Sequence, residues 1–283
     1  MRYVLIGDFF AEDTVGGGGA HSGGAELSDE ILYNIFAEKG EDIFRIRSRF
    51  VGEEFLNDEK DSFFIISNFF HIPPHILERF YNLNYCLVSH DYKFVSHMQP
   101  NHYDNFIVPK HELINTYLFH KAKAIICQSS LQADIHERNL QLKNIINFSG
   151  NLWSMETLDL MSELSSSEKK NIYSVIKSPY CAKGVPEAIS FCIEHRLDYE
   201  LVHDKNHTEF LKKLSANQGV VFWPKVPETC GRICVEAKMM NCVVHTNEML
   251  GASHEPWFNM QGQELINLMK EKHNHIHKVI TSL

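Results

Sequence analysis

The chain has 283 residues, of which 44% are hydrophobic and 22% are charged, with 15 Gly and 9 Pro. This ordinary globular composition excludes disordered, collagen-like and disulfide-scaffold proteins. A formal net charge of −9 disfavours a protein that coats nucleic acid or anionic lipid with positive charge, so any anionic ligand must be held by a local site. The length suits two domains better than one.

The cysteines and the hydropathy of the chain indicate the cellular compartment of the protein. The 7 cysteines are odd in number and form no C-x-x-C pair, which favours buried or incidental thiols in a reducing compartment. We therefore predict a cytoplasmic protein. The longest uncharged stretch, residues 62–77, contains Pro73-Pro74 and is shorter than the roughly 18 apolar residues of a membrane span. We expect no membrane span and no nucleic-acid partner.

Short β-rich apolar runs alternate with longer helix-like segments in the first half of the chain, as is typical of βα units around parallel sheets. We predict strands at residues 3–6, 43–46, 63–66, 85–88, 124–127 and 144–147, and helices at 25–39, 111–120 and 131–138. The polar, Ser-rich residues 162–170 are predicted to form a linker.

The same rhythm restarts after this linker. We predict strands at residues 172–176, 199–202, 220–223 and 243–246, and helices at 185–195, 208–215, 232–240 and 263–272. The expected fold is α/β, with two Rossmann-like domains that face each other across a cleft. We assign residues 1–165 to the N-terminal domain, 166–262 to the C-terminal domain, and 263–283 to a C-terminal helix that packs back on the N-terminal domain. Ligands of such sheets bind at the carboxyl ends of the strands.

A glycine-rich loop, residues 16–26, precedes the first predicted helix. Its glycines would let backbone approach a ligand closely, and the free amides of a helix start attract phosphate or carboxylate. Eight residues separate the loop from the first strand, which does not fit a dinucleotide fingerprint, and no Gly-Lys-Ser/Thr closes it as a Walker A loop. Gly23 and Gly24 lie at the helix start and are the candidate ligand-binding residues. The alternative is a flexible loop.

Histidines offer two further candidates. His90 follows the fourth strand, where it could reach a ligand as a hydrogen-bond donor or proton carrier, although a structural role is equally compatible with its position. His273, His275 and His277 do not share one face of a helix, so we expect no metal site there.

Two segments of the second half carry charged groups at strand ends. In residues 174–184, Lys177 and Lys183 lead into a helix start and could form a small cationic pocket for a diphosphate, or else be solvated loop lysines. In residues 222–246, Glu228 lies in a loop and Glu236 one turn inside the next helix. Two such carboxylates could each hold a pair of vicinal hydroxyls, as a nucleotide sugar presents. The alternative is a surface helix with two unrelated glutamates.

This last segment resembles a known family. Its Pro-Glu…Gly…Val-Glu-Ala-Lys pattern, with Glu228 and Glu236 in E-x7-E spacing, is similar to the donor-binding motif of retaining GT-B glycosyltransferases of the GT4-like group. Supporting matches are Gly23-Gly24-Ala25-Glu26, His90, Lys183-Gly184 and Thr246-Asn247…Gly251-Ala252. The resemblance follows the whole chain in order, and only the stretch from residue 227 to 251 is specific by itself.

The resemblance implies roles for these residues. The C-terminal domain would bind the nucleotide sugar and the N-terminal domain the acceptor. Glu236 would hold the ribose hydroxyls, Glu228 would contact the transferred sugar, and Lys183 would bind the diphosphate. The remaining implied contacts are the loop amides of Thr229, Cys230, Gly231 and Arg232 at the sugar and phosphates, Gly23 and Gly24 over the phosphates, and His90 near the sugar.

The chain departs from the family pattern at one charged position. The family usually has an arginine five residues before the lysine, where this chain has Ser178, so we expect Lys177 or Arg232 to supply that charge. The expected reaction is hexosyl transfer from a UDP-, GDP- or ADP-sugar to a hydroxyl of a glycan or other acceptor, with retention of configuration. The chain has no Asp-x-Asp, so we expect no metal; we also expect no cofactor and no covalent glycosyl intermediate.

Other functions remain open at this point. A nucleotide-sugar epimerase or a phosphorylase would share the two-domain architecture, although nothing in the sequence marks a phosphorylase's phosphate or pyridoxal site. A non-catalytic protein that binds nucleotide sugar or glycan could keep Glu236 without turnover.

Overall fold

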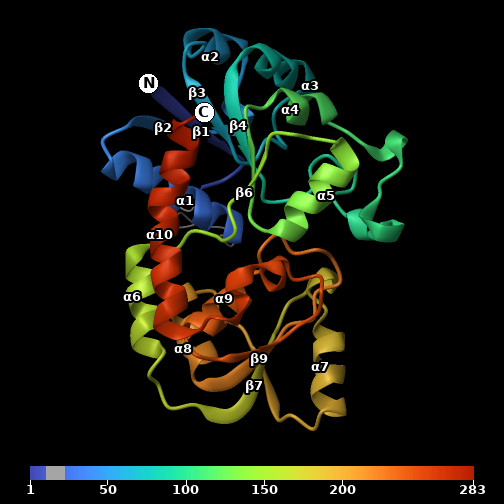
Figure 1. Ribbon diagram of the computed structural model, residues 1–283, viewed down its shortest axis with the longest axis vertical. Coiled ribbons are helices and arrows are strands. Elements are labelled where there is room, and N and C mark those ends of the chain that lie inside the picture. The colour runs from blue at the N-terminus through green and yellow to red at the C-terminus, as the bar shows by residue number, and fades with distance from the viewer. Residues whose placement is uncertain (11–22) are drawn as a thin grey trace. The chain divides into compact units, whose positions relative to one another are not determined.

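The computed structural model describes residues 1–10 and 23–283 of the chain. Their contacts define two compact units. Unit 1 comprises Met1–Leu152 and Lys272–Leu283, and unit 2 comprises Trp153–Glu271. Each unit is built on one parallel β-sheet with helices packed against it (Figure 1).

The sheet of unit 1 has six strands in the order β2-β1-β3-β4-β5-β6, all parallel. Their bounds are β1 (Arg2–Gly7), β2 (Asp42–Arg47), β3 (Phe63–Ile66), β4 (Asn84–Val88), β5 (Ile125–Cys127) and β6 (Ile145–Asn147). The central strands are almost continuous apolar runs because both faces of the sheet are covered. All six predicted strands are confirmed, with shifts of at most one residue at their ends.

The helices of unit 1 are α1 (Gly24–Glu38), α2 (Glu53–Asp58), α3 (Pro74–Leu77), α4 (Thr116–Lys121) and α5 (Ser130–Leu140). The prediction of a helix from residue 111 was wrong at its start, because Asn115 has a left-handed backbone (φ 56°) and α4 begins after it. The start of α5 is fixed by Ser129, whose side chain accepts a hydrogen bond from the Gln132 amide. Helices α2 and α3 are too short to give a periodic sequence pattern.

The last helix, α10 (Gly262–Thr281), is much longer than the predicted 263–272 and spans the division between the units. From Lys272 onward it belongs to unit 1, where Ile276 and Ile280 join the core that includes Phe36 of α1. His277 bonds Glu41 at 2.9 Å. None of the helices in the described part of the chain combines the length and the apolar character needed to cross a membrane.

The sheet of unit 2 has four parallel strands in the order β10-β9-β7-β8. Their bounds are β7 (Lys170–Ile176), β8 (Tyr199–Val202), β9 (Asn217–Val221) and β10 (Val243–His245). One face packs on α7 (Val185–Glu194), and the other on α6 (Met155–Leu164), α8 (His207–Ser215) and α9 (Arg232–Met239). Successive side chains of β9 point to opposite faces of the sheet. Val221 therefore packs in the apolar cluster under α7, and Val220 packs in the cluster under α6, α8 and α9.

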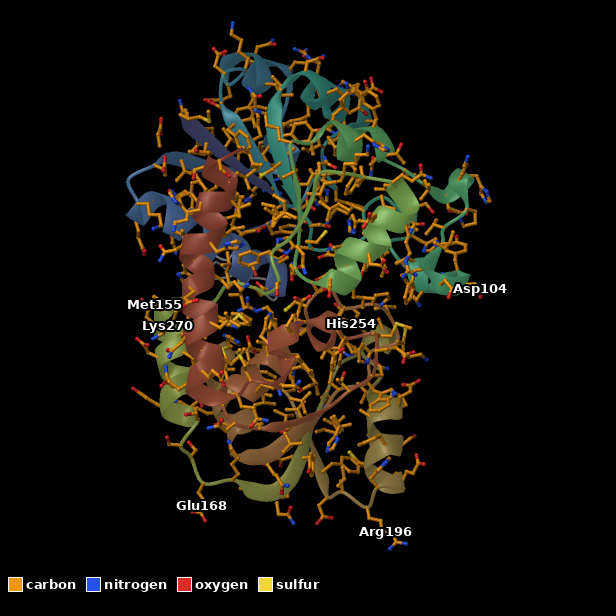
Figure 2. The ribbon with its side chains drawn as sticks, in the orientation of Figure 1. Asp104, Met155, Glu168, Arg196, His254 and Lys270 are labelled. Atoms are coloured by element: carbon orange, nitrogen blue, oxygen red, sulfur yellow. The ribbon has the colours of Figure 1, made fainter. Side chains whose placement is uncertain are left out.

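The division between the units differs from the predicted boundary after residue 165. Helix α6 belongs to unit 2, because Leu158 and Met161 are fully buried in its core and Asp159 pairs with Lys270 of α10 at 2.8 Å. Figure 2 labels Lys270 of α10 and Met155, the first residue of α6. The Ser-rich segment predicted as a linker is therefore the end of an amphipathic helix and a turn that leads into β7.

A tight turn holds the start of α7. Gly184 has φ 61°, and a Cβ at this position would lie 1.7 Å from the Trp223 carbonyl oxygen. We expect Gly184→Ala to lower the free energy of unfolding by about 2–4 kcal/mol, because the backbone must move and a left-handed residue gains a side chain. Urea denaturation measures this. As a control, Gly52→Ala should change stability little, since Gly52 has φ −133° and a Cβ there meets nothing within 4 Å. Equal midpoints for both variants would contradict the expectation.

Candidate functional site

The loop that follows β9 carries Glu228 and ends where α9 begins. Its backbone is fixed against a neighbouring segment: the Glu228 amide donates to the Met249 carbonyl at 2.8 Å, and the Gly251 amide donates to the Glu228 carbonyl at 2.9 Å. Gly231, just before α9, has φ 79°, and a Cβ there would lie 2.1 Å from Leu250 Cδ1. The turn therefore requires glycine, and it places the start of α9 next to this loop.

Lys183 and Glu228 form an ion pair at the carboxyl ends of two neighbouring strands. Lys183 ends a short 3-10 helix after β7, and its Nζ lies 2.6 Å from Glu228 Oε1. The side chains are 36% and 16% exposed. An ion pair this open to solvent adds little to stability, so its members can exchange partners with a ligand at small cost. The structure thus brings together two residues that were predicted from separate segments.

Glu236, in α9, is buried and surrounded by donors. Its Oε1 lies 2.8 Å from Trp153 Nε1, 3.2 Å from His207 Nε2 and 3.6 Å from Arg232 Nε. Burial alone would raise the pKa of this carboxyl. The hydrogen bond and charge of His207, the charge of Arg232 and the hydrogen bond from Trp153 outweigh burial and hold the pKa at about 2. Glu236 is therefore a carboxylate at every physiological pH.

The two candidates for an additional positive charge have different surroundings. Arg232 is only 10% exposed, pairs with Glu236 and lies over the Trp153 ring at 4.6 Å. Burial lowers the pKa of its guanidinium. Lys177 follows β7 directly and is exposed, and its amide donates to the Val202 carbonyl. Of the two, Lys177 is the one whose side chain is open to a ligand.

Thr229 and Cys230 complete the predicted loop. Thr229 is half-buried, whereas Cys230 is buried in the core of unit 2. Burial raises the pKa of the Cys230 thiol to about 12, so this group stays protonated. Its carbonyl accepts a hydrogen bond from the Ala252 amide. Cys230 can thus face a ligand through its backbone but not through a thiolate.

In unit 1, His90 is buried with both ring nitrogens bonded. Nδ1 lies 2.8 Å from Gln128 Nε2, which can only donate, and Nε2 lies 2.9 Å from Asp29 Oδ1. The proton therefore sits on Nε2 and points at Asp29, which also accepts a hydrogen bond from the Ser67 hydroxyl. A direct role for His90 on a ligand, which remains a prediction, requires one of these bonds to open.

Gly23 and Gly24 lie at the start of α1, as predicted. Gly23 precedes the helix with an extended backbone, φ −80°, and no side chain caps the first turn among the residues that the structure describes. The Ser28 hydroxyl oxygen lies 2.7 Å from the Gly24 carbonyl oxygen and 2.5 Å from Asn151 Oδ1, so its single proton can be donated to either. The helix start is thus anchored while its first amides stay free of a side-chain cap. The rest of the glycine-rich loop, residues 16–22, lies outside the described residues.

We compared the chain with known protein families, curated proteins and solved structures. No protein-family model and no curated protein matches the sequence. Among solved structures, Anabaena Alr3699/HepE in complex with UDP and glucose matches at 13% identity and a TM-score of 0.52, over 98% of this chain and 90% of its own. The catalytic domain of starch synthase IV from Arabidopsis thaliana, bound to ADP and acarbose, matches at 11% identity and a TM-score of 0.54, over 97% and 92%.

A third structure is WaaG, a glycosyltransferase involved in lipopolysaccharide biosynthesis, which matches at 11% identity and a TM-score of 0.52, over 96% of this chain and 90% of its own. All three are GT-B glycosyltransferases. The chain has the GT-B fold. At such low identity the likeness concerns the GT-B fold alone.

Sequence reasoning missed two residues of the site, Trp153 and His207. Trp153 is the first residue of unit 2, and His207 is the first residue of α8. Both are far from the E-x7-E segment in the sequence. Only the GT-B packing of α6, α8 and α9 on one face of the sheet brings them to Glu236. His207 could have been suspected from its position after a strand, although the chain has 17 histidines.

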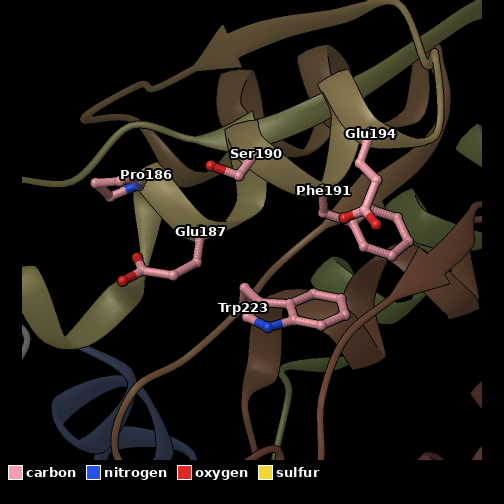
Figure 3. A pocket seen from close by; sticks show the side chains of 6 residues that line it. All are labelled: Pro186, Glu187, Ser190, Phe191, Glu194 and Trp223. Atoms are coloured by element: carbon pink, nitrogen blue, oxygen red, sulfur yellow. The ribbon is translucent and has the colours of Figure 1, made fainter.

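The groove along α7 and the C-terminal histidines do not include any of the predicted site residues. A groove of about 290 Å³ runs along α7 and is lined by Pro186, Glu187, Ser190, Phe191, Glu194 and Trp223 (Figure 3). It contains none of the predicted site residues. Of the three C-terminal histidines, His277 bonds Glu41 and His275 stacks on Phe148. Within the described residues, no group of three His, Cys, Asp or Glu could hold a metal ion.

The depressed pKa of Glu236 predicts a pH dependence of stability. A folded-state pKa below the unfolded value of 4.5 stabilises the protein above pH 4.5, and this contribution is lost as the pH falls toward 2. The shift corresponds to about 3 kcal/mol. We expect Glu236→Gln to remove this part of the acid destabilisation, measured as urea unfolding free energies at pH 6 and pH 3. An unchanged difference between the two pH values would contradict the assignment.

Proposed function

We propose that this protein is a retaining, GT4-like hexosyltransferase that moves a sugar from a nucleoside-diphosphate sugar to a hydroxyl group of an acceptor. The observation that carries the proposal is the ion pair of Lys183 with Glu228, eight residues before the buried carboxylate of Glu236 in one loop and helix. A cation, two carboxylates and a helix start then lie at the strand ends of one GT-B unit, and this set matches a diphosphate flanked by two polyhydroxylated groups.

The donor is assigned as follows. Glu236 accepts the ribose hydroxyls, Glu228 those of the transferred sugar, and Lys183 binds the diphosphate. Lys177 adds charge at the phosphates. The backbone of Thr229, Cys230, Gly231 and Arg232 lines the sugar and phosphates, because the amides of a helix start favour negative charge. The solved structures that hold UDP or ADP with a sugar support this class of donor.

The residues of unit 1 complete the proposal. Gly23 and Gly24 contribute free amides to the phosphates, and His90 lies near the transferred sugar. The acceptor is a glycan or another hydroxyl compound. No nucleic acid is involved, and all 7 cysteines are free thiols, which supports a reducing cytoplasmic location.

In the reaction, the bond between the anomeric carbon and the diphosphate oxygen breaks, and the acceptor oxygen bonds to the same face of that carbon. The acceptor proton leaves with the diphosphate. Lys183 and the α9 amides stabilise the charge that develops on the leaving group, which is the preorganised electrostatic contribution expected of such a site. No metal, organic cofactor or covalent glycosyl intermediate is required.

Incubation with radiolabelled UDP-, GDP- and ADP-hexoses and a panel of glycan acceptors tests the proposal. We expect acceptor-dependent release of one nucleoside diphosphate and a labelled product with the donor's anomeric configuration. Tight donor binding without release of diphosphate would identify a non-catalytic binding protein instead. Conversion of the free nucleotide sugar into its epimer would identify an epimerase.

A further inference from the structure

A chain of buried hydrogen bonds joins the His90 ring to the backbone of unit 1. The Leu152 amide donates to Asn151 Oδ1 at 2.7 Å, and Asn151 Nδ2 donates to Gln128 Oε1 at 3.0 Å. Gln128 Nε2 then lies 2.8 Å from His90 Nδ1. Because a backbone amide can only donate, it fixes which way both side-chain amides are turned. His90 Nδ1 is therefore an acceptor, and the ring carries its proton on Nε2.

Asp29, in α1, occupies the other side of the ring. Its side chain is 1% exposed, and its Oδ1 lies 2.9 Å from His90 Nε2. The hydroxyl of Ser67 donates to Asp29 Oδ2. Ser67 directly follows β3 and His90 lies two residues after β4, so both donors stand at carboxyl ends of strands. A buried carboxylate with both oxygens bonded in this way holds α1 against the edge of the sheet.

The first turn of α1 belongs to the same set of contacts. The Ser28 hydroxyl lies within hydrogen-bond distance of both the Gly24 carbonyl oxygen and Asn151 Oδ1. A cavity of about 20 Å³ borders Asp29, His90 and Asn151. This volume can hold a single water molecule and is too small for a sugar. The His90 ring thus faces protein groups through both nitrogens, and these groups lead back to the start of α1.

We propose that Asp29 acts through His90 as a positioning residue for the start of α1, and that the His90 ring is a neutral hydrogen-bonding group that transfers no proton in the reaction. This inference rests on the proposed function, which assigns the amides of Gly23 and Gly24 to the donor phosphates. A displacement of about 1 Å is enough to disrupt such contacts, so a helix start that presents amides to a ligand must be held firmly.

NMR of the full chain labelled with ¹⁵N-histidine tests the protonation state directly. The signals of His90 are assigned by their loss in His90→Gln. In the wild type we expect an unprotonated Nδ1 and a protonated Nε2, both alone and with saturating UDP, GDP or ADP. In Gln128→Glu, which offers an acceptor to Nδ1, the ring should gain a second proton. A wild-type ring protonated on Nδ1 would overturn the inference.

Titration with the same nucleotides tests the positioning role. In Asp29→Ala the dissociation constant of the nucleoside diphosphate should rise about 10-fold, because the start of α1 is released. Asp29→Asn keeps an acceptor for His90 Nε2 and should restore most of the affinity. Glu38→Ala, at the exposed last residue of α1, should leave the affinity unchanged. An unchanged affinity in Asp29→Ala, or an equal loss in Asp29→Asn, would overturn the inference and not the proposed function.

Rates of sugar transfer in Gln128→Glu separate positioning from proton transfer. The variant changes the charge of the His90 ring and leaves its contacts in place, so we expect the rate to stay within about 3-fold of wild type, with the same pH profile. A shifted pH profile would show that the ring exchanges a proton in the reaction and would overturn the inference. The wild-type spectrum and this profile decide the question if Asp29→Ala does not fold. Absence of wild-type binding by all three nucleotides would overturn the proposed function as well.

Discussion

Glu236→Ala is expected to weaken nucleoside-diphosphate binding by about 100-fold or more, because it removes a buried charged acceptor and leaves the donors around it unpaired. Isothermal titration with the nucleoside diphosphate that binds the wild-type chain measures this. Glu236→Gln keeps the shape and removes the charge, and it should lose most of the same affinity while staying folded.

The matched control for this change is Glu209→Ala. Glu209 lies in unit 2 and pairs with Lys212 on the exposed surface of α8, so its loss should leave affinity unchanged. Wild-type affinity in Glu236→Gln, with the protein folded, would show that Glu236 is a structural carboxylate.

Glu228→Gln should act on turnover instead of binding. The change leaves Lys183 without its carboxylate partner and free to bind the diphosphate, so affinity for the nucleoside diphosphate should stay equal or rise slightly. The contact with the transferred sugar is weakened, and we expect transfer to slow by about 100- to 1,000-fold. Initial rates with radiolabelled donor, together with titration of the nucleoside diphosphate, measure the two effects separately.

Glu187→Gln is the control for Glu228→Gln. Glu187, in α7, makes a comparable ion pair with Lys225 at 3.0 Å. This pair lies outside the proposed donor contacts. Its replacement should leave both rate and affinity near wild type. If Glu228→Gln and Glu236→Gln have the same effect on binding and on rate, the division of roles between the two glutamates is wrong.

The sequence predicts the sheets well because their strands are covered on both faces and read as apolar runs. Every predicted strand is present, and α1, α7 and α9 lie where helical periodicity and glycine positions put them. The site segment from Glu228 to Glu236 is likewise local, so one loop and one helix contain its pattern.

Long-range partners could not be predicted in the same way. The pairing of Lys183 with Glu228 depends on β7 and β9 being neighbours, and the bonds of Trp153 and His207 to Glu236 depend on how α6 and α8 pack. Asp29 faces His90 from α1 across the end of the unit 1 sheet. These contacts join residues far apart in the chain, and their polar side chains look like ordinary surface positions in the sequence.

The division between the units differs from the predicted domain boundary for a related reason. A Ser-rich, charged stretch is typical of a linker, yet the residues before it bury Leu158 and Met161 in the core of unit 2. The apolar spacing of a helix decides its packing more strongly than the polarity of its last turn.

Thermal unfolding with nucleoside diphosphates tests the central claim most directly, because a ligand that binds the native state raises its apparent stability. We predict that at least one of UDP, GDP and ADP raises the wild-type midpoint in a concentration-dependent way, and that Glu236→Gln abolishes the shift while Glu209→Ala keeps it. If none of the three shifts the wild type, or if Glu236→Gln responds as the wild type does, the account of this donor site is contradicted.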